Sequence, residues 1–338
     1  MKRIRLAIIG CGGFVRYHVK RINGAEASVP EFRFAGLCDI IPEKAAKLRR
    51  EQMPRQRIPI FKDYRDLLAK VQPDAVIVST PHTLHFRHAY DSLAAGAHVM
   101  IDKPMVTNSA HARRLVAEAA KAGKRLHVAI QGLHTDTFAY AQKLMTDGTM
   151  GPLQLVTGVL AQGWQKLTVG LWRQEPKLAG GGQLYDSCAH VFSAMMFLVN
   201  SPVTAVHCWA DYRGCKVDIN AVCNIRFANG AMANVTSGGN CAAWCSRLTF
   251  QGANALLEIS PHGGNFRVAS QKMKDEITAA PEGWAIPTVT PVRNFADSIL
   301  GRAEPRVGGH VGILLADLMD AIYASIRTGK VVEVKQSD

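Results

Sequence analysis

The first 130 residues alternate short, almost wholly apolar runs with helical patterns, and this alternation constrains the fold more than any other feature of the chain. The apolar runs are rich in β-branched side chains and cover residues 4–9, 32–38, 75–79, 98–101 and 126–130. Strands that are apolar at nearly every position are buried on both faces, as in a parallel sheet covered by helices. Between them, helices are predicted at residues 14–22, 43–51, 64–70, 84–95 and 110–122.

From residue 151 onward, apolar and polar side chains alternate over longer stretches. Strands with one buried face are therefore predicted at residues 153–162, 203–212, 217–227 and 231–237. Asn229-Gly230, between the last two, is typical of a tight hairpin turn. Further helices are predicted at residues 183–199, 292–300 and 311–327.

These patterns predict an α/β chain of two domains. Residues 1–130 are expected to form a doubly wound parallel sheet, and residues 131–338 an α+β domain with a large, mostly antiparallel open sheet. A chain of 338 residues exceeds the size at which a single core stops growing, which agrees with this division. We expect that the C-terminal helices can pack against the first domain.

The composition limits the kinds of partner that the protein is expected to bind. The 40 Lys and Arg residues exceed the 27 Asp and Glu residues, and the densest basic run covers residues 47–57. That run is typical of a solvated helix end, and no DNA- or RNA-binding pattern accompanies it, so no nucleic-acid partner is expected. No apolar stretch approaches the roughly 20 residues of a membrane span, and none suits a signal peptide. Because the eight cysteines fall mostly in apolar patterns, a cytoplasmic, reducing location is expected.

A glycine-rich turn follows the first predicted strand directly. Gly10 permits a tight turn, and Gly12 and Gly13 lack side chains that would keep backbone amides away from a pyrophosphate. The helix that begins at Phe14 would add the positive potential of its N-terminus. Val15 stands where the third glycine of the G-x-G-x-x-G motif would be, so helix and strand are expected to pack slightly farther apart.

The second predicted strand ends in Asp39, and this acidic residue favours a dinucleotide site over a glycine turn without a ligand. A carboxylate there accepts hydrogen bonds from the adenosine ribose and repels a 2′-phosphate, so NAD is the expected cofactor. Lys44 and Arg49 lie just beyond and leave NADP possible.

Two further segments carry groups suited to proton transfer. Lys103-Pro104 follows the strand 98–101, and loops beyond the carboxyl ends of parallel strands bind ligands; the alternative is a surface lysine before a proline that starts a helix. In the second domain, Asp186 and His190 share a face if a helix begins near residue 183, so the carboxylate can orient the imidazole. This spacing is often structural, and without a third ligand no metal is expected.

Five separated motifs occur in an order that resembles a known family. They are the turn 10–13, the segment Ser79-Thr80-Pro81-His82 with His85, the run from Ala95-Gly96 through His98-Val99 to Asp102-Lys103-Pro104, the segment 180–190, and the closing residues 321–330. Together they are similar, nearly end to end, to the glucose-fructose oxidoreductase / inositol dehydrogenase / MocA family. The resemblance implies a Rossmann domain, then an α/β domain whose open sheet builds homodimers or homotetramers. It also implies NAD(P)-dependent oxidation of sugars, inositols or related polyols.

The resemblance implies that Lys103, Asp186 and His190 are catalytic. The cofactor is expected to contact Gly10, Gly12, Gly13, Phe14, Asp39, Ile40, Thr80, Pro81, His82, His85, Asp102 and Lys103. The second domain offers further candidates for the substrate wall beside the catalytic residues, namely His134, Trp164, Trp172 and Arg173. A tryptophan face can stack on sugar C–H groups, but each tryptophan is equally compatible with a place in the core.

Three positions depart from the pattern of the family. Asp102 replaces the usual glutamate, His82 replaces a common asparagine, and Ser193 stands at a position that is often acidic. None of these changes removes a reacting group, so they bear on the identity of the substrate more than on catalysis.

The predicted chemistry is oxidation of a secondary alcohol. His190, oriented by Asp186, is the favoured base for the hydroxyl proton, and Lys103 holds the oxygen and offsets its developing charge, although the two roles are exchangeable. This requires the three side chains to converge beside the cofactor. Two other functions stay open: a hydrolase or lyase that oxidises a sugar transiently with tightly held NAD, and a non-catalytic dinucleotide sensor. A sensor would need the glycine turn alone.

Overall fold

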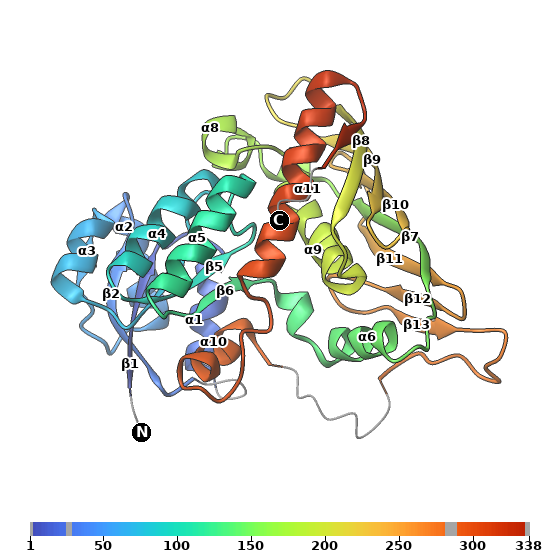
Figure 1. The fold of residues 1–338 in the computed structure, drawn as a ribbon. Helices are drawn as coiled ribbons and strands as arrows, with labels where there is room; N and C mark the ends of the chain where they lie inside the picture. Colours follow the sequence, from blue (N-terminus) through green and yellow to red (C-terminus); the bar gives the residue numbers. More distant parts are fainter. Residues whose placement is uncertain (1–2, 25–28, 281–288, 335–338) are drawn as a thin grey trace. The chain divides into compact units, whose positions relative to one another are not determined.

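The computed structural model describes residues 3–24, 29–280 and 289–334, and within them the chain forms two compact units, each built on one sheet (Figure 1). Unit 1 is made of the described residues up to Val106, of Ala110–Ala129 and of the segment Val289–Gly312. Unit 2 is made of the described residues in Thr107–Ser109, Ile130–Thr288 and Ile313–Asp338.

The six strands of unit 1 are all parallel to their neighbours, in the order β3-β2-β1-β4-β5-β6. They are β1 (Ile4–Ile9), β2 (Phe32–Cys38), β3 (Ile60–Phe61), β4 (Ala75–Val78), β5 (His98–Asp102) and β6 (Leu126–Ala129). The predicted doubly wound parallel sheet is confirmed. The strand β3 is missing from the prediction because two residues are too few to show a periodic pattern.

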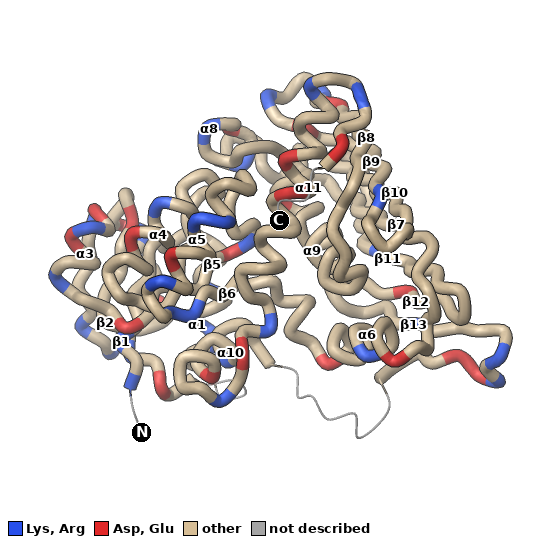
Figure 2. The backbone as a smooth tube through the Cα atoms, viewed as in Figure 1, with Lys and Arg blue, Asp and Glu red and all other residues tan. Residues whose placement is uncertain are grey.

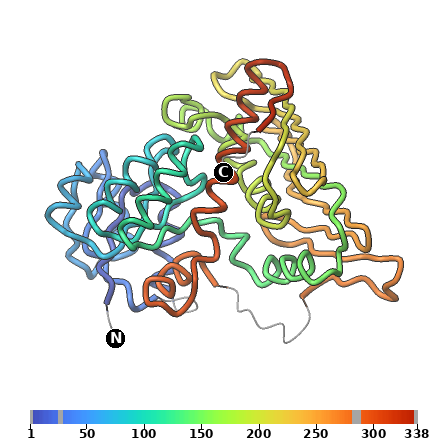
Figure 3. The backbone as a smooth tube through the Cα atoms, in the orientation of Figure 1, coloured from blue at the N-terminus to red at the C-terminus, as the bar shows by residue number. Residues whose placement is uncertain are grey.

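Helices cover the sheet of unit 1. They are α1 (Val15–Asn23), α2 (Pro42–Gln52), α3 (Tyr64–Val71), η1 (His82–Leu84), α4 (His85–Ala94), α5 (Ser109–Lys121) and α10 (Pro291–Ile299). Although α10 lies far along the chain, it packs against α1 and β6 (Figure 3). The ring of Phe295 lies 6.0 Å from that of Phe32, and both belong to the apolar core of this unit.

The eight strands of unit 2 follow the order β13-β12-β11-β7-β10-β9-β8-β14. They are β7 (Leu153–Ala161), β8 (Val203–Asp211), β9 (Asn220–Phe227), β10 (Met232–Gly238), β11 (Cys245–Gly252), β12 (Leu256–Ile259), β13 (Phe266–Ala269) and β14 (Val332–Glu333). All neighbours are antiparallel except β7 and β10, so the predicted open sheet is confirmed. Asn229-Gly230 forms the expected turn between β9 and β10, and β11 to β13 were not predicted.

The helices of unit 2 are η2 (Gln131–His134), α6 (Asp136–Thr146), α7 (Trp164–Leu167), η3 (Trp172–Gln174), α8 (Pro176–Ala179), α9 (Cys188–Val199) and most of α11 (Gly309–Thr328). The helix α9 contacts β7, β11 and α6, and every residue of it except His190 is buried. His190 is therefore the one half-buried side chain of this helix, which is unusual for a polar residue in an otherwise buried helix.

The helix α9 begins at Cys188, later than the predicted start near residue 183. Gly182 N and Leu184 N donate to the carboxylate of Asp218, and Gln183 N donates to its backbone oxygen. These bonds hold the segment in a turn, so the helix starts beyond it. Asp186 therefore lies in the turn before α9, not one helical turn from His190 as predicted.

The helix α11 is 20 residues long and apolar enough, by length and composition, to cross a membrane. No apolar stretch of that length was predicted from the sequence. Half of the apolar window is buried within the protein, as in the core helix of a globular domain. Among its buried residues, Leu318, Met319 and Ile322 have essentially no exposed surface.

Charged residues of both signs are distributed over both units (Figure 2). In the basic run 47–57, Lys47 pairs with Glu51, which also pairs with Arg16 of α1, and Arg49 donates to the backbone oxygen of Ile58. Part of the positive charge of the run is therefore paired within the protein. The expected absence of a nucleic-acid partner stays a prediction.

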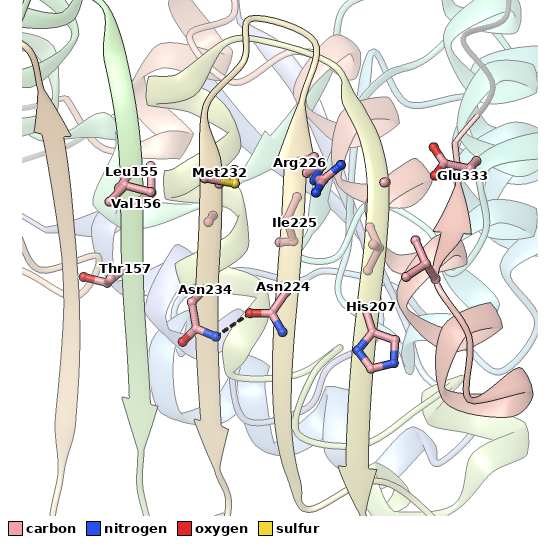
Figure 4. A pocket seen from close by; sticks show the side chains of 14 residues that line it. Leu155, Val156, Thr157, His207, Asn224, Ile225, Arg226, Met232, Asn234 and Glu333 are labelled. Carbon is pink, nitrogen blue, oxygen red and sulfur yellow. Dashed lines mark hydrogen bonds between the residues drawn. The ribbon is translucent and has the colours of Figure 1, made fainter.

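The sheet face opposite α9 carries exposed apolar and neutral polar side chains in register. Figure 4 shows one row across four strands, Thr157, Asn234, Asn224 and His207, in which Asn234 Nδ2 donates to Asn224 Oδ1 at 2.8 Å. On either side of this row lie the exposed apolar residues Leu155, Val159, Trp209, Val222 and Met232. We call this surface the outer face.

Candidate active site

Gly10 closes the turn after β1. Its φ is +94°, and a Cβ atom there would overlap the backbone oxygen of Ser79, so any other residue is both strained and blocked. Cys11 N donates to Asp39 Oδ2 at 2.8 Å, and Ile41 N donates to Asp39 Oδ1 at 2.9 Å. The carboxylate at the end of β2 therefore fixes the glycine turn.

Beyond Gly10 the turn is open. A Cβ atom at Gly12 or Gly13 would meet no other atom within 4 Å, and no side chain caps α1, which begins after Phe14. Uncapped N–H groups at a helix N-terminus bind anionic phosphates. The residues present therefore fit the pyrophosphate of a dinucleotide, and the exposed Ile40 beside Asp39 is available to the adenosine half.

Asp102 ends β5 with both carboxylate oxygens engaged. His18 Nε2 lies 2.7 Å from its Oδ1, and Ser79 Oγ donates to its Oδ2. Burial raises the pKa of Asp102, but the charge and hydrogen bond of His18, together with Ser79, outweigh it and leave that pKa below its ordinary value. The carboxylate ties β5 to α1 and to the end of β4, and the predicted contact of Asp102 with the cofactor stays a prediction. The next peptide bond, Lys103-Pro104, is cis.

His85 is completely buried and links two loops at the carboxyl edge of the sheet. Its Nδ1 lies 2.8 Å from Pro104 O, and its Nε2 lies 2.8 Å from Thr80 O. His85 has no exposed surface and links these two loops, and its predicted contact with the cofactor stays a prediction. His82 is also buried, with its ring 5.8 Å from that of His85. Thr80 and Pro81 are half-buried, and their cofactor contacts stay predictions.

In unit 2, the buried carboxylate of Asp186 binds Trp164 and Arg173, and Arg173 in turn contacts Trp172. Its Oδ2 accepts hydrogen bonds from Trp164 Nε1 at 2.8 Å and from Arg173 Nε at 2.9 Å. The guanidinium of Arg173 also lies over the ring of Trp172, 4.6 Å from its centre. Arg173 and Trp172 are half-buried, and their contact with substrate stays a prediction.

Two predicted wall residues are buried instead. Trp164 is 2% exposed and packs against Val217 and Ile219, so its indole holds Asp186 and has no face for a sugar. His134 is also buried, and its Nδ1 lies 2.8 Å from Ile130 O. Burial of both side chains does not favour the expected substrate contacts of Trp164 and His134, which stay predictions. A lone aromatic residue after a strand gives the same sequence signal whether it is buried or exposed.

Around His190 the fold gathers residues that the sequence analysis missed. The ring of His262 lies 4.7 Å from that of His190, and its Nδ1 lies 2.8 Å from Ser246 Oγ. On the other side of His262, the ring of Trp244 lies 5.0 Å away. These residues belong to β11 and to the segments before β11 and after β12, which carried no recognisable motif. The orientation of His190 by Asp186 stays a prediction.

Asp218 and Tyr323 fix the glycine segment that precedes Asp186. Asp218 accepts hydrogen bonds from Gly182 N at 2.7 Å and from the Tyr323 hydroxyl at 2.6 Å. A Cβ atom at Gly181 would overlap the Tyr323 hydroxyl, and one at Gly182 would overlap the backbone of Asp218. Close packing within the protein therefore requires glycine at both positions.

Lys103 follows β5 in unit 1, whereas Asp186 and His190 belong to unit 2. Their convergence on one substrate stays a prediction. Among the described residues, no group of three or more His, Cys, Asp or Glu side chains is arranged to hold a metal ion.

Two family models match this chain, one for each part of it. Residues 4–130 match the model described as "Oxidoreductase family, NAD-binding Rossmann fold", and residues 138–258 match the model of the "GFO/IDH/MocA C-terminal domain". The chain therefore belongs to the Gfo/Idh/MocA family of oxidoreductases, and its first part is an NAD-binding Rossmann domain. The predicted resemblance is confirmed.

Individual relatives are distant. The D-glucoside 3-dehydrogenase of Escherichia coli is 26% identical over 59% of this chain, and the match spans 55% of that protein. The levoglucosan dehydrogenase of Pseudarthrobacter phenanthrenivorans is 26% identical over 74% of this chain and 71% of its own length. Among solved structures, the aldose-aldose oxidoreductase from Caulobacter crescentus, complexed with glycerol, is 26% identical with a TM-score of 0.82, covering 98% of this chain and 100% of that one.

Proposed function

We propose that this protein is an NAD-dependent dehydrogenase that oxidises a secondary alcohol of a sugar, an inositol or a related polyol. The observation that carries the proposal is the placement of His190, the one residue of α9 that is not buried. The open glycine turn after β1 and the sugar dehydrogenases among the relatives support it.

The reaction asks two things of the side chains. His190 accepts the hydroxyl proton, because an imidazole titrates near neutral pH. Lys103 donates a hydrogen bond to the same oxygen and offsets the negative charge that develops there. Bound NAD supplies the acceptor for the two electrons of the alcohol, and the glycine turn with Asp39 would hold it.

Asp186 keeps the second half of the site in place. Its carboxylate is held by Trp164 and Arg173, so it is a buried negative charge with fixed orientation just before α9. A fixed carboxylate close to the start of α9 favours the protonated form of His190 after proton transfer. Asp186 and the ring of Trp172 together also fix the orientation of the Arg173 guanidinium.

The test is a substrate screen. Purified protein is incubated with inositols, aldoses, glycosides and sugar acids, each with NAD and with NADP, and the absorbance of the reduced nicotinamide is followed. Stoichiometric accumulation of NADH supports the proposal. Turnover of a glycoside without net NADH would instead identify the transient-oxidation chemistry of a hydrolase or lyase, and activity with NADP alone would contradict the role given to Asp39.

We further propose that the outer face joins copies of the chain into a homodimer or homotetramer. The exposed side chains of Leu155, Val159, Trp209, Val222 and Met232 lie in register on neighbouring strands. They form two apolar groups on either side of the neutral polar row that Figure 4 shows, and grouped exposed apolar side chains mark interaction surfaces more than single ones do.

A further inference from the structure

One end of the sheet in unit 2 collects side chains from segments that are distant in the sequence. The strand β11 begins at Cys245, which pairs with Ala161 at the end of β7, and the end of β12 pairs with the start of β11. The segment before β11 therefore lies beside the segment after β12. His262 follows β12, and its ring contacts that of His190 at the start of α9.

Trp244 lies one ring beyond His262. The centres of the Trp244 and His262 rings are 5.0 Å apart at an angle of 81°, and those of His262 and His190 are 4.7 Å apart at 60°. Ser246 holds His262 through the 2.8 Å contact between Oγ and Nδ1. His262 therefore contacts the proposed base through one ring contact and Trp244 through another, and Ser246 fixes its orientation.

The indole of Trp244 is 58% exposed, so most of a large apolar ring faces water next to the proposed reaction centre. An exposed indole of this kind gains free energy when it stacks on the C–H face of a sugar or on another ring. His262 is in ring contact with His190, and Trp244 is in ring contact with His262. Trp244 is thus placed to meet whatever is attached to a sugar ring that reacts at His190.

We propose that Trp244 and His262 form a ledge that binds the second part of a glycoside, beyond the sugar ring that is oxidised at His190. This inference rests on the proposed function and deepens it, because it names glycosides, with an aryl group or a second sugar as the attached part, as the substrate class. Free monosaccharides would use His190 without the ledge.

Trp209 provides a matched control within the same chain. It is 61% exposed, and its ring lies 4.3 Å from that of His207 at an angle of 89°, so it is also an exposed indole packed edge-on against a histidine. It differs in place, since it belongs to the outer face on β8. A general loss of exposed aromatic surface would affect both tryptophans, whereas loss of the ledge affects Trp244 alone.

The experiment compares phenyl β-D-glucoside with D-glucose. We measure kcat/KM for both in the wild type, Trp244→Ala, Trp244→Phe, His262→Ala and Trp209→Ala, with the melting temperature and the molecular mass of each variant. We expect Trp244→Ala to lower kcat/KM for the phenyl glucoside relative to D-glucose by about 10-fold, mainly through KM. His262→Ala should shift the ratio in the same direction, Trp244→Phe should restore most of it, and Trp209→Ala should leave it unchanged.

An unchanged ratio in a folded Trp244→Ala variant would overturn the ledge. So would a change in molecular mass without a change in the ratio, because Trp244 would then contact a second copy of the chain. Binding of phenyl β-D-glucoside is also measured by quenching of tryptophan fluorescence. If this glucoside neither reacts nor binds while an inositol is oxidised in the screen, the ledge is rejected and the proposed function stands; if nothing in the screen is oxidised, the proposed function itself fails.

Discussion

Asp39, Asp102 and Asp218 use their carboxylates to hold backbone and side chains of the protein in place. Asp39 accepts two backbone N–H groups, Asp102 binds His18 and Ser79, and Asp218 receives two amides and a tyrosine hydroxyl. A buried carboxylate is tolerated only where donors replace its hydration, so each of these residues is surrounded by donors. At the scale of single residues, the acidic groups determine where the loops of the proposed site lie.

The first prediction concerns the proposed reacting groups. Lys103→Ala and His190→Ala should each lower kcat by about 100-fold or more, because loss of a positioned acid, base or oxyanion donor has effects of this size. Binding of NADH, measured by its fluorescence, should stay within about twofold of wild type. Full turnover in either variant would refute the role given to that residue.

The second prediction concerns Glu31, whose side chain is 4% exposed and pairs with Arg293 at 2.9 Å and with Arg302 at 2.7 Å. Hydrogen bonding by Arg293 lowers the pKa of Glu31 to about 2, which is below the value of about 4.3 in an unfolded chain. The stabilisation from the Glu31 carboxylate is therefore complete above about pH 4.3 and is lost as pH falls toward 2.

Glu31→Gln should lower the free energy of unfolding at pH 7 by about 2 kcal/mol, and the difference from wild type should shrink as the pH falls below 4. Urea unfolding at a series of pH values measures it. Glu304→Gln is the control, because Glu304 also pairs with an arginine, Arg125, but its side chain is 79% exposed and its loss should have little effect. Equal effects of the two substitutions would show that burial of Glu31 is unimportant.

At the scale of elements, the glycine turn after β1 separates two reasons for a glycine. Gly10 is required by its positive φ and by the nearby backbone of Ser79, whereas Gly12 faces open space. The fold requires the first glycine, and the second is predicted to serve a ligand.

The third prediction follows from this contrast. Gly12→Ala should weaken NADH binding by about 10-fold or more with a melting temperature within about 2 °C of wild type, because the new methyl group fills space that the pyrophosphate needs. Gly10→Ala should destabilise unit 1 itself by about 2 kcal/mol or more. Calorimetry and NADH titration on both variants measure these effects, and normal NADH binding by Gly12→Ala would contradict the assignment of the turn.

Element boundaries show what sequence patterns could and could not predict. The strands β1 and β2 were predicted to the residue, since an apolar run bounded by polar residues has a single interpretation. The start of α9 was misplaced because Asp218, which lies 36 and 34 positions beyond the two amides that it accepts, keeps the segment out of the helix. No local pattern records such a contact.

At the scale of the whole molecule, the outer face is the feature that one chain alone leaves unexplained. Val222 lies between Trp209 and Thr236 in one row of that face, and Val159 lies in the same row beyond Thr236. A charge introduced there must be buried without a partner if two copies join through this surface.

The fourth prediction is that Val222→Asp lowers the oligomeric mass. Light scattering coupled to size-exclusion chromatography should show a dimer or tetramer for the wild type and a smaller species for the variant at the same concentration. The fold of the variant, checked by circular dichroism, should be unchanged because Val222 faces outward. A wild-type protein that is a monomer at high concentration would reject the proposed assembly.

The sequence by itself determined the two sheets, the glycine turn, the acidic end of β2 and the family, because these depend on periodicity and on residues close together in the chain. The tertiary structure decided which predicted residues are buried and which distant side chains meet. It buried His85, His134 and Trp164, and it placed His262 in contact with both His190 and Trp244. Burial and long-range contact depend on how strands from different parts of the chain pair, and a side chain carries no local signal of the neighbour that will cover it.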